Sequence, residues 1–221
     1  MVLMDISEGM LKVAAKRVKE EGLQNKIAIK KGDITKTGYA DENFDMILCE
    51  HALFVFKEPD AVMKEFRRIL KKKARLIISA QNRYVQSLSL LSGKPSLDNV
   101  DRAFKILLSE EYERMTEDGK VKIYTWTPNE FRAMLERNRF YVEKIVGKGT
   151  TMPLRISEKL YMKKEHPEDL LNKILQFELA LCEKPDALAL AGHLQAIAYN
   201  YKIIDKGTRT LLPKMAKLSF S

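Results

Sequence analysis

Long apolar runs and cysteines are scarce in this 221-residue sequence, and each scarcity excludes a class of protein. No stretch of about 18 uncharged apolar residues occurs, so the sequence predicts no membrane-spanning helix. The first five residues reach an acidic side chain without a basic leader, so we expect no signal peptide. Cys49 and Cys182 stand alone in apolar surroundings. We expect both to be buried free thiols of a cytoplasmic protein rather than a disulfide or a metal site.

Positive charge is in excess, with a formal net charge of +9, and such an excess attracts acidic partners. Most of the basic residues, however, alternate with glutamate along helices. The dense basic runs are residues 67–73 and 202–217, and neither has the interleaved aromatic residues of a nucleic-acid-binding motif. We therefore expect no nucleic-acid partner and interpret residues 202–221 as a basic tail.

Short apolar strands alternate with amphipathic helices through the first 80 residues. Helices are expected after Ser7, a good N-cap, and at Pro59, a favoured first helical residue. Alternation at this short spacing predicts a parallel sheet with helices on both faces and right-handed crossovers. One domain over residues 1–201 accounts for it. The expected strands are Val2–Met4, Ile27–Ile29, Phe44–Cys49 and Leu76–Ser79.

The middle of the chain, Gln81–Lys122, breaks this alternation. It is longer than an ordinary connection, so we interpret it as a lid or specificity element over the carboxyl ends of the strands. Within it, Val100–Met115 has the apolar spacing of a helix.

The last third of the domain returns to helices and strands. Thr127–Glu130 has the pattern of a capping box with proline at the first helical position. A strand is expected at Tyr141–Val146, a helix after Pro167, and a final apolar strand at Gly192–Tyr201.

Five segments in this order resemble the class I S-adenosylmethionine-dependent methyltransferases. They are VLMDISEGMLKVAAKR, IKKGDI, FDMILCEHALFVF, EFRRILKKKARLIIS and TWTPNEFRAMLERNRFYVEKIVG, and the terminal GHLQAIA resembles the family's seventh strand. The resemblance covers residues 1–201. It implies a doubly wound Rossmann-like α/β sheet, mostly parallel, in which the last strand runs antiparallel. It also implies methyl transfer from S-adenosylmethionine to a small-molecule acceptor.

The sequence departs from the family at its start. The strand, Gly-x-Gly-x-Gly loop and helix that open the family's domain are not present, and that first strand normally lies between the second and fourth strands. We therefore expect one of three arrangements. Val2–Met4 pairs directly with Phe44–Cys49, another chain or a second copy donates a strand, or the sequence is part of a longer one.

The resemblance assigns the cofactor-binding residues at the ends of the early strands. Asp5 would accept hydrogen bonds from the ribose hydroxyls, with Ile6 beside it. Asp33 would accept from the adenine amino group while Ile34 offers its backbone amide, and Cys49 would lie at the cofactor's edge. Asp5 also fits a carboxylate at a helix N-terminus, and Asp33 fits ordinary turn chemistry.

Glu50 and His51 follow the fourth-strand motif and are the candidate catalytic residues. They face the crevice in which open parallel sheets bind ligands, where they would orient the acceptor or take its proton. A capping glutamate and a surface histidine are the structural alternatives. Three residues that border the insertion are candidates for the acceptor pocket: Arg83, Tyr84 and Trp126. Three residues that follow His51 are expected in the core: Leu53, Phe54 and Phe56.

Two other functions fit parts of the sequence. One is a catalytically inactive, methyltransferase-like binding or scaffolding subunit, which the absent glycine loop favours. The other is a nicotinamide-dependent dehydrogenase, because Asp5 and Asp33 suit that cofactor too. A short-chain dehydrogenase needs Tyr-x-x-x-Lys, however, and none of the eight tyrosines is followed by lysine at that spacing.

Overall fold

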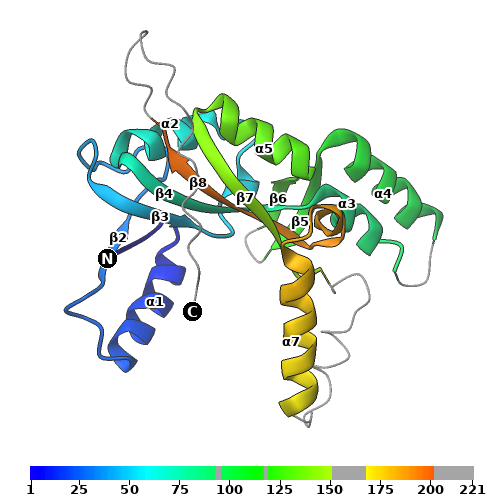
Figure 1. Ribbon diagram of the computed structural model, residues 1–221, viewed down its shortest axis with the longest axis horizontal. Coiled ribbons are helices and arrows are strands. Elements are labelled where there is room, and N and C mark those ends of the chain that lie inside the picture. The colour runs from blue at the N-terminus through cyan, green and yellow to red at the C-terminus, as the bar shows by residue number, and fades with distance from the viewer. Residues whose placement is uncertain (93–95, 117–118, 151–167, 202–221) are drawn as a thin grey trace.

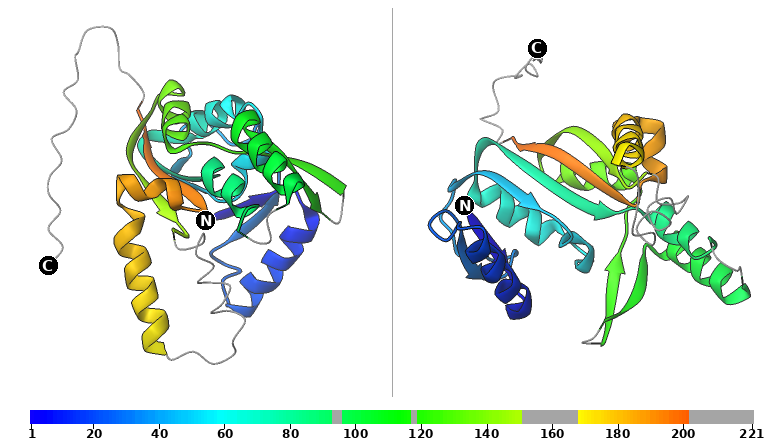
Figure 2. Two further views of the ribbon diagram at one scale, coloured as in Figure 1. Left: turned by 90° about the vertical axis from the view of Figure 1, so that its right-hand side faces the viewer. Right: turned by 90° about the horizontal axis from the view of Figure 1, so that it is seen from below.

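The computed structural model describes residues 1–92, 96–116, 119–150 and 168–201, so the expected tail at 202–221 lies outside the described residues. A four-stranded sheet lies at the centre (Figure 1). One face is covered by α2 (Asp60–Ile69) and α5 (Pro128–Arg137). From the other face α1 (Glu8–Glu20) and α7 (Glu168–Cys182) project, as the views of Figure 2 also show.

The chain begins with a strand–helix–strand unit, as its alternation predicts. The strands β1 (Val2–Asp5) and β2 (Ala28–Lys31) pair in parallel, with Asp5 opposite Lys31. Between them, Ser7 caps α1 by accepting a hydrogen bond from the amide of Met10. This unit carries the first two candidate cofactor residues at its carboxyl end.

The central sheet has the order β3-β4-β8-β7. The strands β3 (Phe44–Cys49) and β4 (Leu70–Gln81) are parallel. The last strand, β8 (His193–Asn200), runs antiparallel to both β4 and β7 (Phe140–Lys148). The prediction of an antiparallel final strand is therefore confirmed.

The main core lies between this sheet and the two helices above it. On β8, alternate residues Leu194, Ala196 and Ala198 are fully buried. They pack in one cluster with residues of α2 and α5, including Phe66 and Phe131. The residues after His51 that were expected in the core also belong to it. Leu53 is fully buried, and Phe54 and Phe56 pack against the cluster.

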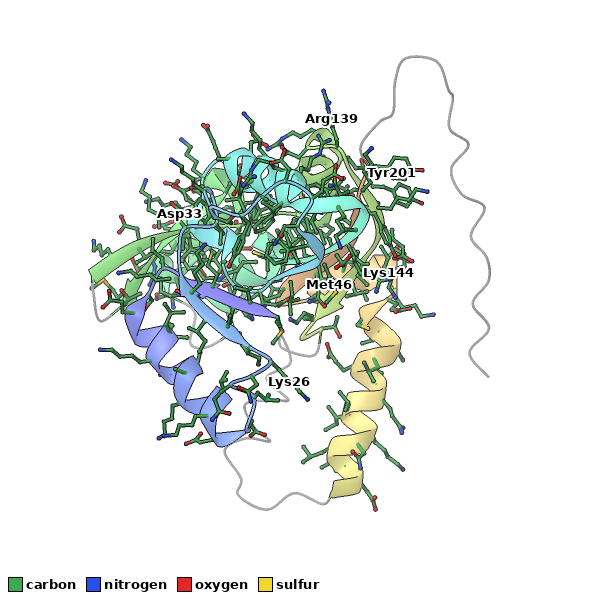
Figure 3. The ribbon with its side chains drawn as sticks, turned by 90° about the vertical axis from the view of Figure 1, so that its left-hand side faces the viewer. Lys26, Asp33, Met46, Arg139, Lys144 and Tyr201 are labelled. Carbon is green, nitrogen blue, oxygen red and sulfur yellow. The ribbon has the colours of Figure 1, made fainter. Side chains whose placement is uncertain are left out.

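The described strands of the domain do not form one continuous sheet. There, β1 pairs with β2 alone and β3 pairs with β4 alone, so β1 and β3 do not pair. Direct pairing of Val2–Met4 with Phe44–Cys49, one of the three expected arrangements, is thus not formed. On the face from which α1 and α7 project, Met46 and Leu48 of β3 are 53% and 60% exposed (Figure 3).

The connection between β2 and β3 is fixed on α2 by buried hydrogen bonds. Glu65 of α2 accepts hydrogen bonds from the amide and the hydroxyl of Thr37, at 2.8 and 2.6 Å. Arg68 donates to the same carboxylate and also to Asp41. Hydrogen bonds from Arg68 and Thr37 outweigh burial and lower the pKa of Glu65 to about 2. This anchor therefore holds the connection on α2.

The insertion extends from the carboxyl end of β4 and differs in detail from the sequence prediction. It contains α3 (Arg83–Ser89), α4 (Leu97–Ser109) and a hairpin of β5 (Glu111–Thr116) and β6 (Gly119–Tyr124). The predicted helix at Val100–Met115 is right only as far as Ser109. Glu110 then adopts a left-handed conformation with φ 67°, and the hydroxyl of Tyr112 donates to Gln81 on β4, so tertiary contacts convert the rest to a strand.

Two sequence signals for helices have different outcomes. The capping box of α5 is confirmed: the Thr127 hydroxyl accepts from the amide of Glu130, whose side chain accepts from the amide of Thr127. Pro59 is the N-cap of α2 and not its first helical residue, because its ψ of 1° lies outside the helical range.

The anchor between Thr37 and Glu65 can be tested by stability. Glu65→Ala should lower the free energy of unfolding by about 1–3 kcal/mol, because it leaves the buried Thr37 donors without an acceptor. Asp41→Ala removes only the exposed partner of Arg68 and should cost less than about 1 kcal/mol. Chemical denaturation of both variants measures the difference, and equal losses would contradict the anchoring role.

Candidate functional site

The candidate cofactor acids lie at the carboxyl ends of the first two strands. Asp5 ends β1, and Asp33 follows β2 by two residues. Figure 3 shows Asp33 at the opposite end of β2 from Lys26, on the same side as the β5–β6 hairpin. Open α/β sheets bind their ligands outside this end of the strands. The structure therefore brings both acids to the expected edge.

Each acid uses one carboxylate oxygen in its own turn. Oδ1 of Asp5 accepts from the amide of Ser7 at 2.8 Å. Oδ1 of Asp33 accepts from the amide and the hydroxyl of Thr35, and these bonds lower the pKa of Asp33. The second oxygen of each has no hydrogen-bond partner among the described residues and is left to accept from a ligand. The structural roles expected for these residues are present, and they leave room for a binding role.

The apolar cofactor candidates have different surroundings. Ile6 is 69% exposed beside Asp5, whereas Ile34 is half-buried against the main core. Cys49 is 6% exposed within the core, and burial raises the pKa of its thiol to about 12. The side chain of Cys49 is thus a packing group, and only its backbone is left to face a ligand. Cys182 is partly exposed, so the expectation that both cysteines are buried is wrong for it.

Glu50 is held by an ion pair across the sheet. Its Oε2 accepts from Lys148 at 2.7 Å, and its Oε1 accepts from Gln195. Burial opposes ionisation of Glu50, but the hydrogen bonds from Lys148 and Gln195 outweigh it and lower its pKa. A carboxylate engaged in this way orients its neighbours better than it accepts a proton.

The ring of His51 contacts a second histidine, which was not predicted from the sequence. The amide of His51 donates to the Ser79 hydroxyl at 3.1 Å, and its φ of 54° lies in the left-handed region. Its ring meets that of His193, at the start of β8, edge to face, with centroids 4.8 Å apart. Because β8 is antiparallel, its first residue lies at the carboxyl ends of β3 and β4. That orientation, itself predicted from the sequence, was the signal that could have found His193.

The residues expected to border an acceptor pocket divide into anchors and an exposed side chain. Arg83 is buried and donates to Glu130 and to the carbonyl oxygen of Thr125, so it fastens the insertion to α5. Trp126 is 9% exposed and belongs to the main core. Tyr84 is 37% exposed and is the one of the three left to contact a ligand.

The described ranges contain neither a metal-binding cluster nor a membrane-spanning helix. No group of three or more His, Cys, Asp or Glu side chains there is arranged to hold a metal ion. No helix in them has the length and apolarity needed to cross a membrane.

Comparisons with known proteins agree with this architecture. Residues 1–78 match the family model described as a methyltransferase domain. A demethylmenaquinone methyltransferase of Bacteroides fragilis is 39% identical over 74 residues, which cover 34% of this chain and 30% of that protein. The methyltransferase GfsG of Streptomyces halstedii is 29% identical over 107 residues, covering 44% of this chain and 38% of its own.

Solved structures extend the likeness over most of the chain. A methyltransferase structure from Methanosarcina mazei has a TM-score of 0.58 and 13% identity, covering 90% of this chain and 81% of its own. One from Listeria monocytogenes also has a TM-score of 0.58, with 16% identity and coverage of 91% and 79%. Residues 1–78 thus resemble the methyltransferase domain family, and the described chain has the fold of S-adenosylmethionine-dependent methyltransferase structures. Its match spans only about a third of the length of the curated relatives.

Within this methyltransferase fold, the environment of His193 predicts a pH-dependent stability. Burial, and then the charges of His51 and Lys148, lower the pKa of His193 from 6.5 to about 4. In the unfolded chain the imidazole takes up its proton near pH 6.5, so the free energy of unfolding should fall between pH 6.5 and 4. His193→Gln should reduce this loss by on the order of 1–3 kcal/mol.

Denaturation curves over this pH range measure the effect. Tyr199→Phe changes a polar residue on the same face of β8 and serves as the control. A pH profile that is the same in His193→Gln and in the unsubstituted protein would contradict the account.

Proposed function

We propose that this chain carries the fold and the nucleoside-binding residues of an S-adenosylmethionine-dependent methyltransferase that acts on a small-molecule acceptor. The observation that carries the proposal is the pair of acids, Asp5 and Asp33, at the carboxyl ends of two adjacent parallel strands within the segment that matches the family. S-adenosylmethionine, when bound, supplies a methyl group on a sulfonium centre, which is already a strong electrophile. The protein must therefore bind and position the two reactants, and positioning alone accounts for much of the rate in such reactions.

The nucleoside end of the cofactor fits the residues present. The free oxygen of Asp5 suits the two ribose hydroxyls, because an ionised acceptor forms strong hydrogen bonds. Asp33 suits the adenine amino group, and the backbone amide of Ile34 suits a ring nitrogen. Ile6 and the end of β3 at Cys49 supply the surroundings.

The methionine end of the cofactor requires a further element. In the described part of the chain β1 pairs only with β2 and β3 only with β4, so one edge of each strand has no partner strand. Each unpaired backbone group costs about 1–3 kcal/mol once it is buried without a partner. We propose that a parallel strand fills the space, supplied by another polypeptide, by a second copy or by a longer form of this chain.

The acceptor is proposed to bind on the central sheet, beneath the insertion at Gln81–Lys122. Glu50 holds Lys148 there, and His51 is available to orient the acceptor. The relatives named demethylmenaquinone methyltransferase make a quinone-like molecule the first class to test. Their similarity covers only 74 and 73 residues, however. It therefore supports cofactor binding and does not identify the acceptor. The free thiols of Cys49 and Cys182 support a cytoplasmic location.

Cofactor binding tests the proposal by isothermal titration with S-adenosylmethionine. The isolated chain should bind weakly, with a dissociation constant at or above about 1 mM. Fusing the strand, glycine loop and helix of a complete relative ahead of Met1 should tighten binding by at least about 100-fold, because it pairs both open edges. Tight binding by the isolated chain, insensitive to Asp5→Ala, would sink the proposal.

The role of Asp5 can be tested in the fused form. Asp5→Ala should weaken binding by about 10-fold or more, the value of a hydrogen bond to a charged group. Asp45→Ala removes a carboxylate of β3 that pairs with Lys71 and should leave the affinity unchanged. The inactive scaffolding subunit remains the alternative function. A fused form that binds the cofactor but transfers no methyl group to any phenolic, enolic or amine acceptor would favour it.

A further inference from the structure

The side-chain amide of Gln81, at the end of β4, uses only part of its hydrogen-bonding capacity. Gln81 is 2% exposed, and its Oε1 accepts from the hydroxyl of Tyr112 at 2.7 Å. Its Nε2 carries two N–H donors, and neither donates to a group in the described part of the chain. Buried polar groups are almost always hydrogen-bonded, so free donors at such a position require an explanation. They lie at the carboxyl end of β4, the edge at which open α/β sheets bind ligands.

A cation from the insertion is held beside this amide. Arg114 on β5 donates from Nη2 to the hydroxyl of Tyr112 at 2.9 Å, and its Cζ lies 5.9 Å from the centre of the Tyr112 ring. The same hydroxyl donates to Gln81, so one oxygen atom joins the guanidinium to the amide. That hydroxyl also lies 3.2 Å from Oε1 of Gln86 on α3, which fixes it from a second side. The Arg114 side chain is therefore oriented although it is exposed.

Arg114 is the cation of the hairpin whose charge is not balanced. Lys120 pairs with Glu113 at 3.3 Å, and Lys122 pairs with Glu111 at 3.1 Å. No carboxylate among the residues that the structure describes is within ion-pair distance of Arg114. The guanidinium thus keeps its full charge and most of its N–H donors for a ligand.

The central sheet beneath the hairpin contributes little further charge. Lys148 is paired with Glu50. The ring of His193, opposite Gln81 on β8, is neutral near pH 7, because burial and positive neighbours lower its pKa to about 4. Those neighbours are His51, Lys148 and Arg114. The unbalanced charge of Arg114 therefore matches a ligand that carries one negative charge.

We propose that Arg114 and Gln81 bind a carboxylate of the methyl acceptor, so that the acceptor is an anionic small molecule. The planar guanidinium matches the two oxygens of a carboxylate, and an amide N–H of Gln81 adds a donor from the sheet. This inference deepens the proposed function and rests on it for the role of the bound molecule. Both residues lie outside residues 1–78, so the family match does not assign them.

The pair explains how the insertion would select an acceptor. Arg114 comes from the hairpin and Gln81 from the sheet, so a bound carboxylate joins the insertion to the strand ends. A neutral molecule of the same shape leaves the charge of Arg114 unbalanced and the donors of Gln81 unused. A site built to hydrogen-bond one group discriminates strongly against analogues that lack it.

Titration of the unmodified chain with propionate, followed by NMR, tests the pair. The side-chain N–H resonances of Arg114 and Gln81, assigned by their loss in Arg114→Gln and Gln81→Met, should both shift, with a dissociation constant in the millimolar range. Arg114→Gln should weaken binding by at least about 10-fold, the value of a hydrogen bond to a charged group. Lys120→Gln removes an ion-paired cation of the same hairpin and should leave binding unchanged. Propionamide, which has the same shape but no charge, should cause no shifts.

The cofactor has a carboxylate of its own, and the fused form separates the two sources. There, Arg114→Gln should leave the affinity for S-adenosylmethionine unchanged, and a loss of that affinity would reassign the pair to the cofactor and overturn the inference. Asp5→Ala should leave propionate binding intact even where it abolishes cofactor binding, so the failure of one proposal is distinguishable from the failure of the other.

Four other results would also overturn the carboxylate site. They are no binding of propionate, shifts retained in folded Arg114→Gln protein, equal shifts with propionamide, and tighter binding of inorganic phosphate than of propionate. Thermal unfolding of each variant shows that it is folded.

Discussion

Backbone pairing between parallel strands is the constraint on which the arrangement of this protein depends. Each interior strand of a sheet satisfies hydrogen bonds on both edges, yet β1 and β3 use one edge each in the described part of the chain. They belong to separate sheets, and the connection between these sheets is held on α2 by the Thr37–Glu65 anchor. The candidate site is consequently divided. One half, with Asp5 and Asp33, belongs to the small parallel sheet, and the other half belongs to the central sheet.

The two halves differ in how they treat charge. On the small sheet, Asp5 and Asp33 keep one oxygen outside their turns, where water solvates it, and such exposed carboxylates cost little to maintain. On the central sheet, Glu50 is already ion-paired with Lys148, and His193 is kept neutral by burial and by positive neighbours. The Glu50–Lys148 pair is itself partly exposed, with 24% and 40% of the two side chains accessible, so water screens its charges in part.

The sequence predicts well wherever a local pattern determines the structure. The first four strands, the capping box at Thr127 and the antiparallel last strand all follow from apolar spacing, caps or the ordered motifs. The apolar spacing at Val100–Met115 predicts a helix throughout, but the second part forms a hairpin strand. A helix and a hairpin compete there, and the Tyr112–Gln81 contact favours the hairpin. His193 was missed for a related reason. Its neighbours Lys148 and Gln81 come from strands 45 and 112 residues away in sequence, and their register is a tertiary property.

The end of β3 is where the two halves must act together. Cys49 fixes the strand in the core, Glu50 ties it to β7 and β8, and His51 then turns back through a left-handed conformation. A residue with a Cβ in that conformation costs on the order of 1 kcal/mol, which glycine would avoid. Glycine, however, would remove the ring that packs on His193. The local strain is therefore compensated by contacts that also orient the histidine. Cys49, Glu50 and His51 thus give the carboxyl end of β3, beside its unpaired edge, a fixed shape. A strand and a cofactor can be positioned against it.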